Sequence, residues 1–255
     1  MRRFLSRIAV VSMVILFSVI PCMVVGVVFG GAGALAAEPL LPPPYQIANT
    51  NHIVVGVTWD EAVVRKLLPP GIKPVDGMTG GINIYQAPNG YGITPYQSAY
   101  FWVDIEGFDS PQGTKGRWML QGVYGPEAKT ANALREFYGF PVRNGTSRLE
   151  ETAESKRAMG ILDGQPFVTV EIKPMPDPCQ NISGLLNYPG VVEKTKQIMI
   201  NQIPYTLDLC KAEVISVKVT APPGDPFAAL HPAKVLGAVE LKNGAFSFSR
   251  PVPAP

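Results

Sequence analysis

Charged side chains and histidines are scarce in this 255-residue chain. Only 16% of its residues are charged, and 22 Lys and Arg residues almost balance 20 Asp and Glu residues. Because no lysine- or arginine-rich run is present, the sequence does not favour a nucleic-acid partner. Its two histidines and three cysteines lack the spacing of metal ligands. We therefore expect neither a metal nor another cofactor.

The standard catalytic signatures are missing as well. The sequence contains no Gly-x-Ser-x-Gly elbow, no His-Glu-x-x-His helix, no Walker loop and no Gly-x-Gly-x-x-Gly after a strand. His231 lies in a Leu-His-Pro turn and His52 enters a strand, and we assign both a structural role. In contrast, 46% of the residues are hydrophobic, which excludes wholesale disorder and is enough for one globular domain.

The N-terminus has the three parts of a signal peptide. Arg2, Arg3 and Arg7 precede an almost unbroken apolar run over residues 8–29, and Ala34-x-Ala36 offers a cleavage site. We expect residues 1–36 to direct export, which makes the protein secreted or periplasmic. The alternative is an uncleaved anchor, because the run is long enough to span a bilayer. Any membrane contact would then be made by this segment alone.

Without residues 1–36, the chain carries 19 basic and 20 acidic side chains and two cysteines. Cys179 and Cys210 can form a disulfide in an oxidising compartment. They can equally be two buried free thiols. The sequence leaves both alternatives open.

The rest of the chain is organised as one domain. Residues 37–48 form a proline-rich lead-in, and residues 49–250 form the domain. Thr58-Trp-Asp-Glu61 resembles a capping box that opens a first helix. A second helix starts near Pro126, and Gly139 is its expected C-cap.

Strand-like segments make up most of the domain, as their alternation of apolar and polar residues indicates. They lie at 53–57, 81–86, 99–105, 118–124, 148–152, 158–162, 167–172, 197–203, 207–219 and 235–248. Two or three helices among about ten strands predict an α+β fold built on an antiparallel sheet, closed or strongly curled.

One stretch, from Tyr124 to Gly145, resembles the signature of the acetoacetate decarboxylase family. The residues in register with that signature are Tyr124, Arg135, Glu136, Phe140, Pro141 and Gly145. Weaker similarity covers most of residues 45–250. The resemblance implies a cone-like, closed antiparallel barrel around a small apolar cavity, and it also implies a homo-oligomer.

The same resemblance implies that the family's chemistry is lost. Its members use the first of two tandem lysines to form a Schiff base, and these positions are Val142 and Arg143 here. A valine cannot form an imine, and a guanidinium stays protonated. The family's strand-entry arginine falls at Thr50. One of its active-site glutamates falls at Tyr96 and the other near Gly81 or Asn83.

The altered positions predict a ligand-binding pocket with no certain catalytic residue. We expect apolar walls and a cation that clamps a carboxylate. A replacement nucleophile would have to be Lys156 or one of the other eleven lysines after residue 36. The predicted ligand-binding residues are Thr50, Asn83, Tyr96, Trp118, Phe140, Val142 and Arg143.

Three functions agree with these expectations. The first is an exported protein that binds a small carboxylate or carbonyl compound without imine chemistry. The second is a lyase, of decarboxylase or hydratase type, that uses Arg143, Tyr96 or a displaced lysine for acid–base work. The third is a structural or interaction module of the cell envelope whose cavity is vestigial.

Overall fold

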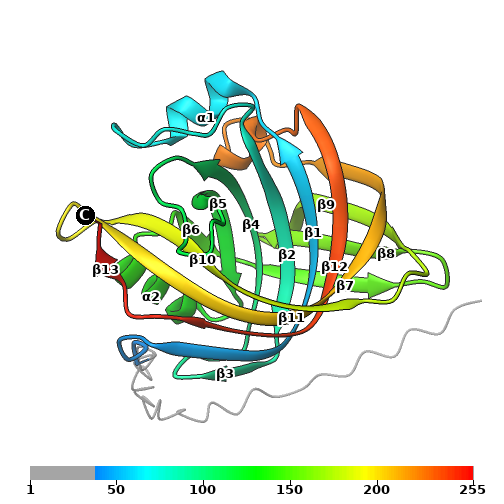
Figure 1. Ribbon diagram of the computed structural model, residues 1–255, viewed down its shortest axis with the longest axis horizontal. Coiled ribbons are helices and arrows are strands. Elements are labelled where there is room, and N and C mark those ends of the chain that lie inside the picture. The colour runs from blue at the N-terminus through cyan, green and yellow to red at the C-terminus, as the bar shows by residue number, and fades with distance from the viewer. Residues whose placement is uncertain (1–37, 255) are drawn as a thin grey trace, which may run out of the picture. The chain divides into compact units, whose positions relative to one another are not determined.

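The computed structural model describes residues 38–254, and it shows one large sheet that curls around two cores (Figure 1). The predicted signal peptide therefore lies outside the described residues. The helices are α1 (Glu61–Leu67), α2 (Ala128–Tyr138) and the 3₁₀ helix η1 (Pro226–Ala229). The strands are β1 (Tyr45–Thr58), β2 (Thr79–Ala87), β3 (Asn89–Tyr91), β4 (Tyr96–Ile105), β5 (Gly116–Gly125), β6 (Val142–Asn144), β7 (Thr146–Glu151), β8 (Lys156–Leu162), β9 (Gln165–Pro174), β10 (Gln180–Val192), β11 (Gln197–Val219), β12 (Lys234–Phe248) and β13 (Val252–Pro253).

The strand order is β6-β5-β4-β2-β1-β12-β11-β9-β8-β7, with β10 and β13 paired to β11 and β3 paired to β1. All these pairings are antiparallel except that of β5 with β6, so the sheet is mixed. Within residues 38–254, β6 and β7 at the two ends do not pair, and the closed barrel is therefore not confirmed. The chain crosses from one end of the sheet to the other at Gly145, which links the two end strands covalently rather than by a ladder.

Each face of the central strands packs against a different core. On β4, Phe101 and Val103 contact a largely aliphatic core under β8 and β9. The neighbouring Tyr100 and Trp102 contact a largely aromatic core, which also includes residues of α2 and β10. This arrangement follows from the two-residue period of a strand, since successive side chains point to opposite faces. Both faces are buried, so the central strands have few polar residues.

The two predicted helices are present, with one shifted boundary. Helix α1 begins at Glu61, and its N-cap is Asp60, whose carboxylate accepts from the backbone N–H of Val63. Thr58 is still in strand β1, so the expected capping box is absent. Helix α2 ends at Gly139, whose φ of 68° is the left-handed conformation expected of a glycine C-cap.

Cys179 and Cys210 form a disulfide, which decides between the two alternatives left open by the sequence. The bond joins the segment just before β10 to β11. Strand β1 begins at Tyr45, within the predicted lead-in, where it pairs with the end of β12. Among the described residues, none of the helices has the length and apolarity needed to cross a membrane.

Candidate ligand-binding site

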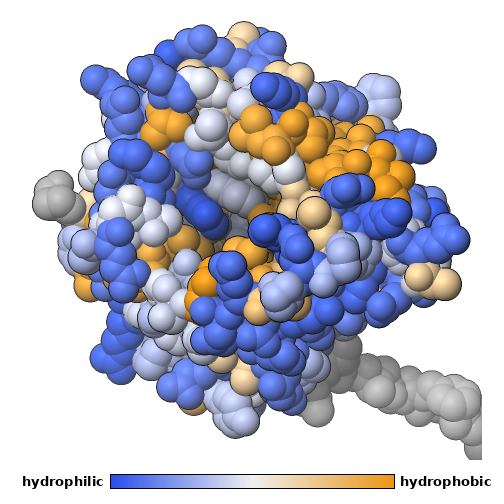
Figure 2. All heavy atoms as spheres, turned by 45° about the vertical axis from the view of Figure 1, so that its right-hand side comes forward, coloured by the Kyte–Doolittle hydropathy of each residue, from blue (hydrophilic) through white to orange (hydrophobic). Residues whose placement is uncertain are grey.

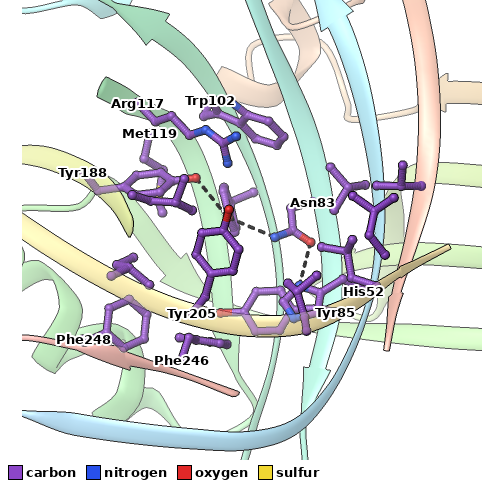
Figure 3. A pocket seen from close by; sticks show the side chains of 18 of the residues that line it. His52, Asn83, Tyr85, Trp102, Arg117, Met119, Tyr188, Tyr205, Phe246 and Phe248 are labelled. Carbon is purple, nitrogen blue, oxygen red and sulfur yellow. Dashed lines mark hydrogen bonds between the residues drawn. The ribbon is translucent and has the colours of Figure 1, made fainter. Parts of the chain in front are cut away.

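A pocket of about 230 Å³ lies on the aromatic face of the sheet (Figure 3). Strands β1, β2, β4 and β5 form one wall, and β10, β11 and β12 form the other. The lining residues that carry a polar atom are His52, Asn83, Tyr85, Tyr100, Trp102, Arg117, Tyr124, Tyr188 and Tyr205. Its other lining residues are Val54, Met119, Phe140, Ile182, Leu186, Ile203, Leu207, Leu209, Val239, Leu241, Phe246 and Phe248. Figure 2 shows the molecular surface hollowed near the centre of the view, with polar and apolar side chains around the hollow.

A continuous chain of hydrogen bonds crosses the pocket wall (Figure 3). The hydroxyls of Tyr188 and Tyr100 are 3.1 Å apart, and the amide nitrogen of Asn83 donates to Tyr100 at 3.0 Å. The amide oxygen of Asn83 lies 3.1 Å from Nδ1 of His52, and Nε2 of His52 lies 2.8 Å from the hydroxyl of Thr50. Five polar side chains are thus joined in series by four hydrogen bonds, at the pocket surface or directly behind it.

The amide orientation of Asn83 determines the tautomer of His52. Because the Asn83 oxygen can only accept, Nδ1 of His52 carries the proton and Nε2 accepts from Thr50. Burial lowers the pKa of His52 to about 4. The imidazole is therefore neutral near pH 7, and it stacks on Tyr85 with ring centroids 4.5 Å apart.

Arg117 is the one formal charge that lines the pocket within the described residues. Its guanidinium carbon lies 4.8 Å from the ring centroid of Trp102, a cation–π geometry. Burial alone would lower the pKa of Arg117. The neighbouring Tyr188, Tyr100 and Asp104 outweigh burial and raise this pKa above its ordinary value. Its Nε is 3.9 Å from Asp104 and has no hydrogen-bond partner in the described part of the chain.

No lysine, aspartate or glutamate of residues 38–254 lines this pocket. Lys156, one of the lysines that could replace the nucleophile, lies elsewhere, with Nζ 2.7 Å from Glu240 and 3.1 Å from Glu151. Burial alone lowers the pKa of Lys156, but the two carboxylates outweigh burial and raise it. The amine is therefore held as an ammonium, which is not a nucleophile.

Three of the residues predicted for ligand binding are at or beside this pocket. Asn83 and Phe140 line it. Thr50 is fully buried behind the wall, where its hydroxyl bonds to His52. It therefore reaches the pocket only through the histidine.

The other four predicted residues do not line this pocket. Trp118 packs in the aliphatic core, on the opposite face of β5 from Arg117 and Met119. Tyr96 and Val142 are buried in the aromatic core, where the Tyr96 hydroxyl is 2.9 Å from that of Tyr85.

Arg143 is also placed elsewhere, because it follows Val142 on strand β6 and so points to the opposite face. Its Nη1 and Nη2 each lie 2.9 Å from a carboxylate oxygen of Asp225, and its guanidinium packs over Phe227. The pocket cation is Arg117 instead. A signal for it is present in the sequence: one arginine within the otherwise uncharged strand 116–125. His52, for which the sequence predicts a structural role, also lines the pocket.

The described residues contain no group of three or more His, Cys, Asp or Glu side chains arranged to hold a metal ion. No family model matches the sequence. No curated protein matches it either.

Solved structures do match. Acetoacetate decarboxylase from Legionella pneumophila superposes with a TM-score of 0.68 at 12% identity, over 89% of this chain and 93% of that one. MppR, an enzyme of enduracididine biosynthesis, was solved with pyruvate bound and matches at 0.60 and 13% identity, over 85% and 92%. An acetoacetate decarboxylase-like enzyme from Sphingomonas wittichii RW1 matches at 0.59 and 14% identity, over 87% and 97%. The chain therefore has the acetoacetate decarboxylase-like fold, as the resemblance in its sequence implied.

Proposed function

We propose that this protein binds a small molecule with a carboxylate or carbonyl group, and that it does so without forming an imine. The observation that carries the proposal is the composition of the pocket: one guanidinium, several phenol hydroxyls and aromatic walls, with no lysine among the described lining residues. Without a lysine amine, a carbonyl compound has no nucleophile with which to form a Schiff base.

Two further observations support the ligand class. A structure of the same fold was solved with pyruvate, a small oxo acid. The pocket also combines apolar walls with a few polar groups, which is typical of small-molecule sites. The third candidate, an envelope module with a vestigial cavity, does not explain why the charged side chain of Arg117 lines the pocket.

The proposal is tested by incubating the protein with acetoacetate and, separately, with pyruvate, with and without borohydride. Intact mass and released CO₂ are then measured. We expect no borohydride-dependent mass increase and no CO₂ release from acetoacetate. A lysine adduct would overturn the proposal, because it would require a nucleophile that the pocket lacks.

The second candidate is a lyase or hydratase that works without an imine, and the groups around the pocket favour it. The neutral imidazole of His52 and the protonated phenol of Tyr188 both line the pocket, so groups able to accept or donate a proton are present at the site. Turnover of an oxo acid without a borohydride adduct would support this function over binding alone.

We also propose that the protein is exported and that cleavage follows Ala36. The tripartite N-terminal sequence supports export. The disulfide between Cys179 and Cys210 is typical of an oxidising compartment. N-terminal sequencing of the protein recovered from outside the cytoplasm should begin at Ala37. An intact residue 1 on membrane-bound protein would indicate the anchor instead.

A further inference from the structure

We propose that the ligand is an arylalkanoate, a short-chain carboxylic acid with one aromatic ring, and that Arg117 binds its carboxylate. This inference rests on the proposed function of the pocket and names the ligand class and the residue that selects it. It also replaces Arg143, the cation favoured by the sequence, with a different side chain.

Arg117 is a cation whose charge is incompletely compensated. The nearest acid is Asp104, but its Oδ1 accepts from Nε1 of Trp102 at 3.3 Å and its Oδ2 accepts from the Thr79 hydroxyl at 2.8 Å. The distance from Asp104 to Nε of Arg117, 3.9 Å, is too long for a hydrogen bond. A largely desolvated guanidinium without a bonded anion is costly, so the site favours an added carboxylate.

The geometry around Arg117 suits a carboxylate in particular. A guanidinium has a planar fork of N–H donors that matches the two oxygens of a carboxylate. The Tyr188 hydroxyl lies beside Arg117 on the pocket wall (Figure 3), and burial raises the pKa of Tyr188 well above its ordinary value. The phenol therefore stays protonated and offers a further donor to the same anion.

The far end of the pocket is apolar. Figure 3 places Arg117 and Trp102 at one end, and Phe246 and Phe248 at the other. Leucine and isoleucine side chains of β10 and β11 complete the wall between the two ends. A ligand that fills this pocket must therefore have a charged end and an apolar body, and aromatic walls favour a ring by edge-to-face contact.

The volume suits a ligand with one ring. A cavity of about 150 Å³ lined by apolar residues holds one benzene molecule. The pocket here has a volume of about 230 Å³, which is enough for a ring and a short carboxylate chain. Acetate or propionate would leave most of the aromatic end empty.

The test uses calorimetric titration of the full protein with three probes: 3-phenylpropionate, the neutral analogue 3-phenylpropan-1-ol, and propionate. We expect 3-phenylpropionate to bind at least tenfold more tightly than either of the others. None of the three has a ketone or aldehyde group, so the result is independent of whether imines form. Equal affinity of the acid and the alcohol would overturn the role of Arg117, while binding of both would leave the pocket itself as a binding site.

Variants locate the anion site. Arg117→Gln should abolish the preference for the acid and leave the affinity for the alcohol within about twofold. Arg117→Lys keeps the charge without the planar fork and should retain only part of the preference. Arg148→Gln, which removes an exposed arginine on β7, is the matched control and should bind as the unmodified protein does. The affinity for the alcohol reports whether each variant is folded, and an Arg117→Gln variant that still prefers the acid would contradict the proposal.

Discussion

Arg143 and Asp225 form a two-point ion pair on the face of the sheet that is opposite to the pocket. Asp225 also accepts from the backbone N–H of Phe227, so the pair fixes the start of η1 against β6. The hydrogen bond from Arg143 lowers the pKa of Asp225, which keeps its carboxylate ionised. The role of Arg143 is therefore to hold the fold.

Replacing Arg143 tests this role. Arg143→Gln should lower the free energy of unfolding by about 1–2 kcal/mol, because it leaves a partly buried carboxylate without its cation. Affinity for 3-phenylpropionate should not change. Urea titration and calorimetry of the same preparation measure both quantities. An unchanged stability combined with a large loss of affinity would place Arg143 in the ligand site after all.

His52 should make the protein less stable in mild acid. Its pKa is about 4 in the fold and about 6.5 in the unfolded chain, so the unfolded state binds the extra proton between these values. Stability is therefore complete above pH 6.5 and decreases as the pH falls toward 4, by up to about 3 kcal/mol from this group.

The measurement is the free energy of unfolding from pH 7.5 to 4.5. His52→Gln, which retains hydrogen-bonding capacity toward Asn83 and Thr50, should have a flatter profile than the unmodified protein. His231→Gln, a change at the exposed histidine, is the control and should retain the slope. Identical profiles for all three proteins would show that His52 titrates normally.

At the scale of elements, β10 and β11 form a long antiparallel ribbon that makes one wall of the pocket. Gln180 pairs with Leu209 at one end of the ribbon and Val192 pairs with Gln197 at the other. The disulfide between Cys179 and Cys210 lies beside the first of these pairs. It therefore fixes the end of the ribbon from which Ile182 extends into the pocket.

Removing the disulfide should destabilise this wall. Cys179→Ser combined with Cys210→Ser opens a loop whose ends are 31 residues apart. In the chain-entropy treatment the loss is about 3–4 kcal/mol. Denaturant titrations of the two proteins measure it, and a reducing agent should bring the unmodified protein to the level of the double variant. Equal stability under oxidising conditions would contradict the expectation.

The sequence predicted some elements well and missed others, among them β10. Helix α2 was predictable because Pro126, an apolar stripe and Gly139 are all local signals. Strand β10 was not among the expected strands, since Gly184, Pro189 and Gly190 interrupt its alternation. Its pairing with β11, and not its own propensity, makes it a strand.

At the scale of the whole molecule, the sheet curls so tightly that β8 approaches β4. A Cβ placed on Gly160 of β8 would lie 2.7 Å from Cβ of Ala99 on β4 and 2.7 Å from the ring of Phe167. Only hydrogen fits at this position. The curl therefore depends on the absence of a side chain there.

Gly160→Ala should push β8 away from β4 and lower the free energy of unfolding by about 2 kcal/mol or more. Gly56→Ala is the matched control in β1, because its added Cβ would meet no atom closer than 3.7 Å. It should change stability by well under 1 kcal/mol. Thermal or urea unfolding of the two variants makes the comparison. If Gly160→Ala leaves the stability unchanged, β8 and β4 must be farther apart than the 2.7 Å contact implies.

The location of the site depends on information that single motifs do not contain. The motif at 134–145 correctly indicated the fold, because it resembles a family signature along the chain. The same motif does not show which way Arg143 points, since the face that a side chain takes depends on the two-residue period within β6. Arg117 and Tyr188 meet only because β5 and β10 lie against each other across the pocket, a long-range contact that no local pattern encodes.

Binding without an imine is tested most directly with phenylpyruvate, which has the ring and carboxylate of the proposed ligand class together with a ketone. The measurement is the intact mass of the protein at a saturating concentration of phenylpyruvate, after addition of borohydride. An unchanged mass is expected, because no lysine of the described chain lines the pocket. A mass increase equal to one reduced ligand, located on a lysine, would contradict it.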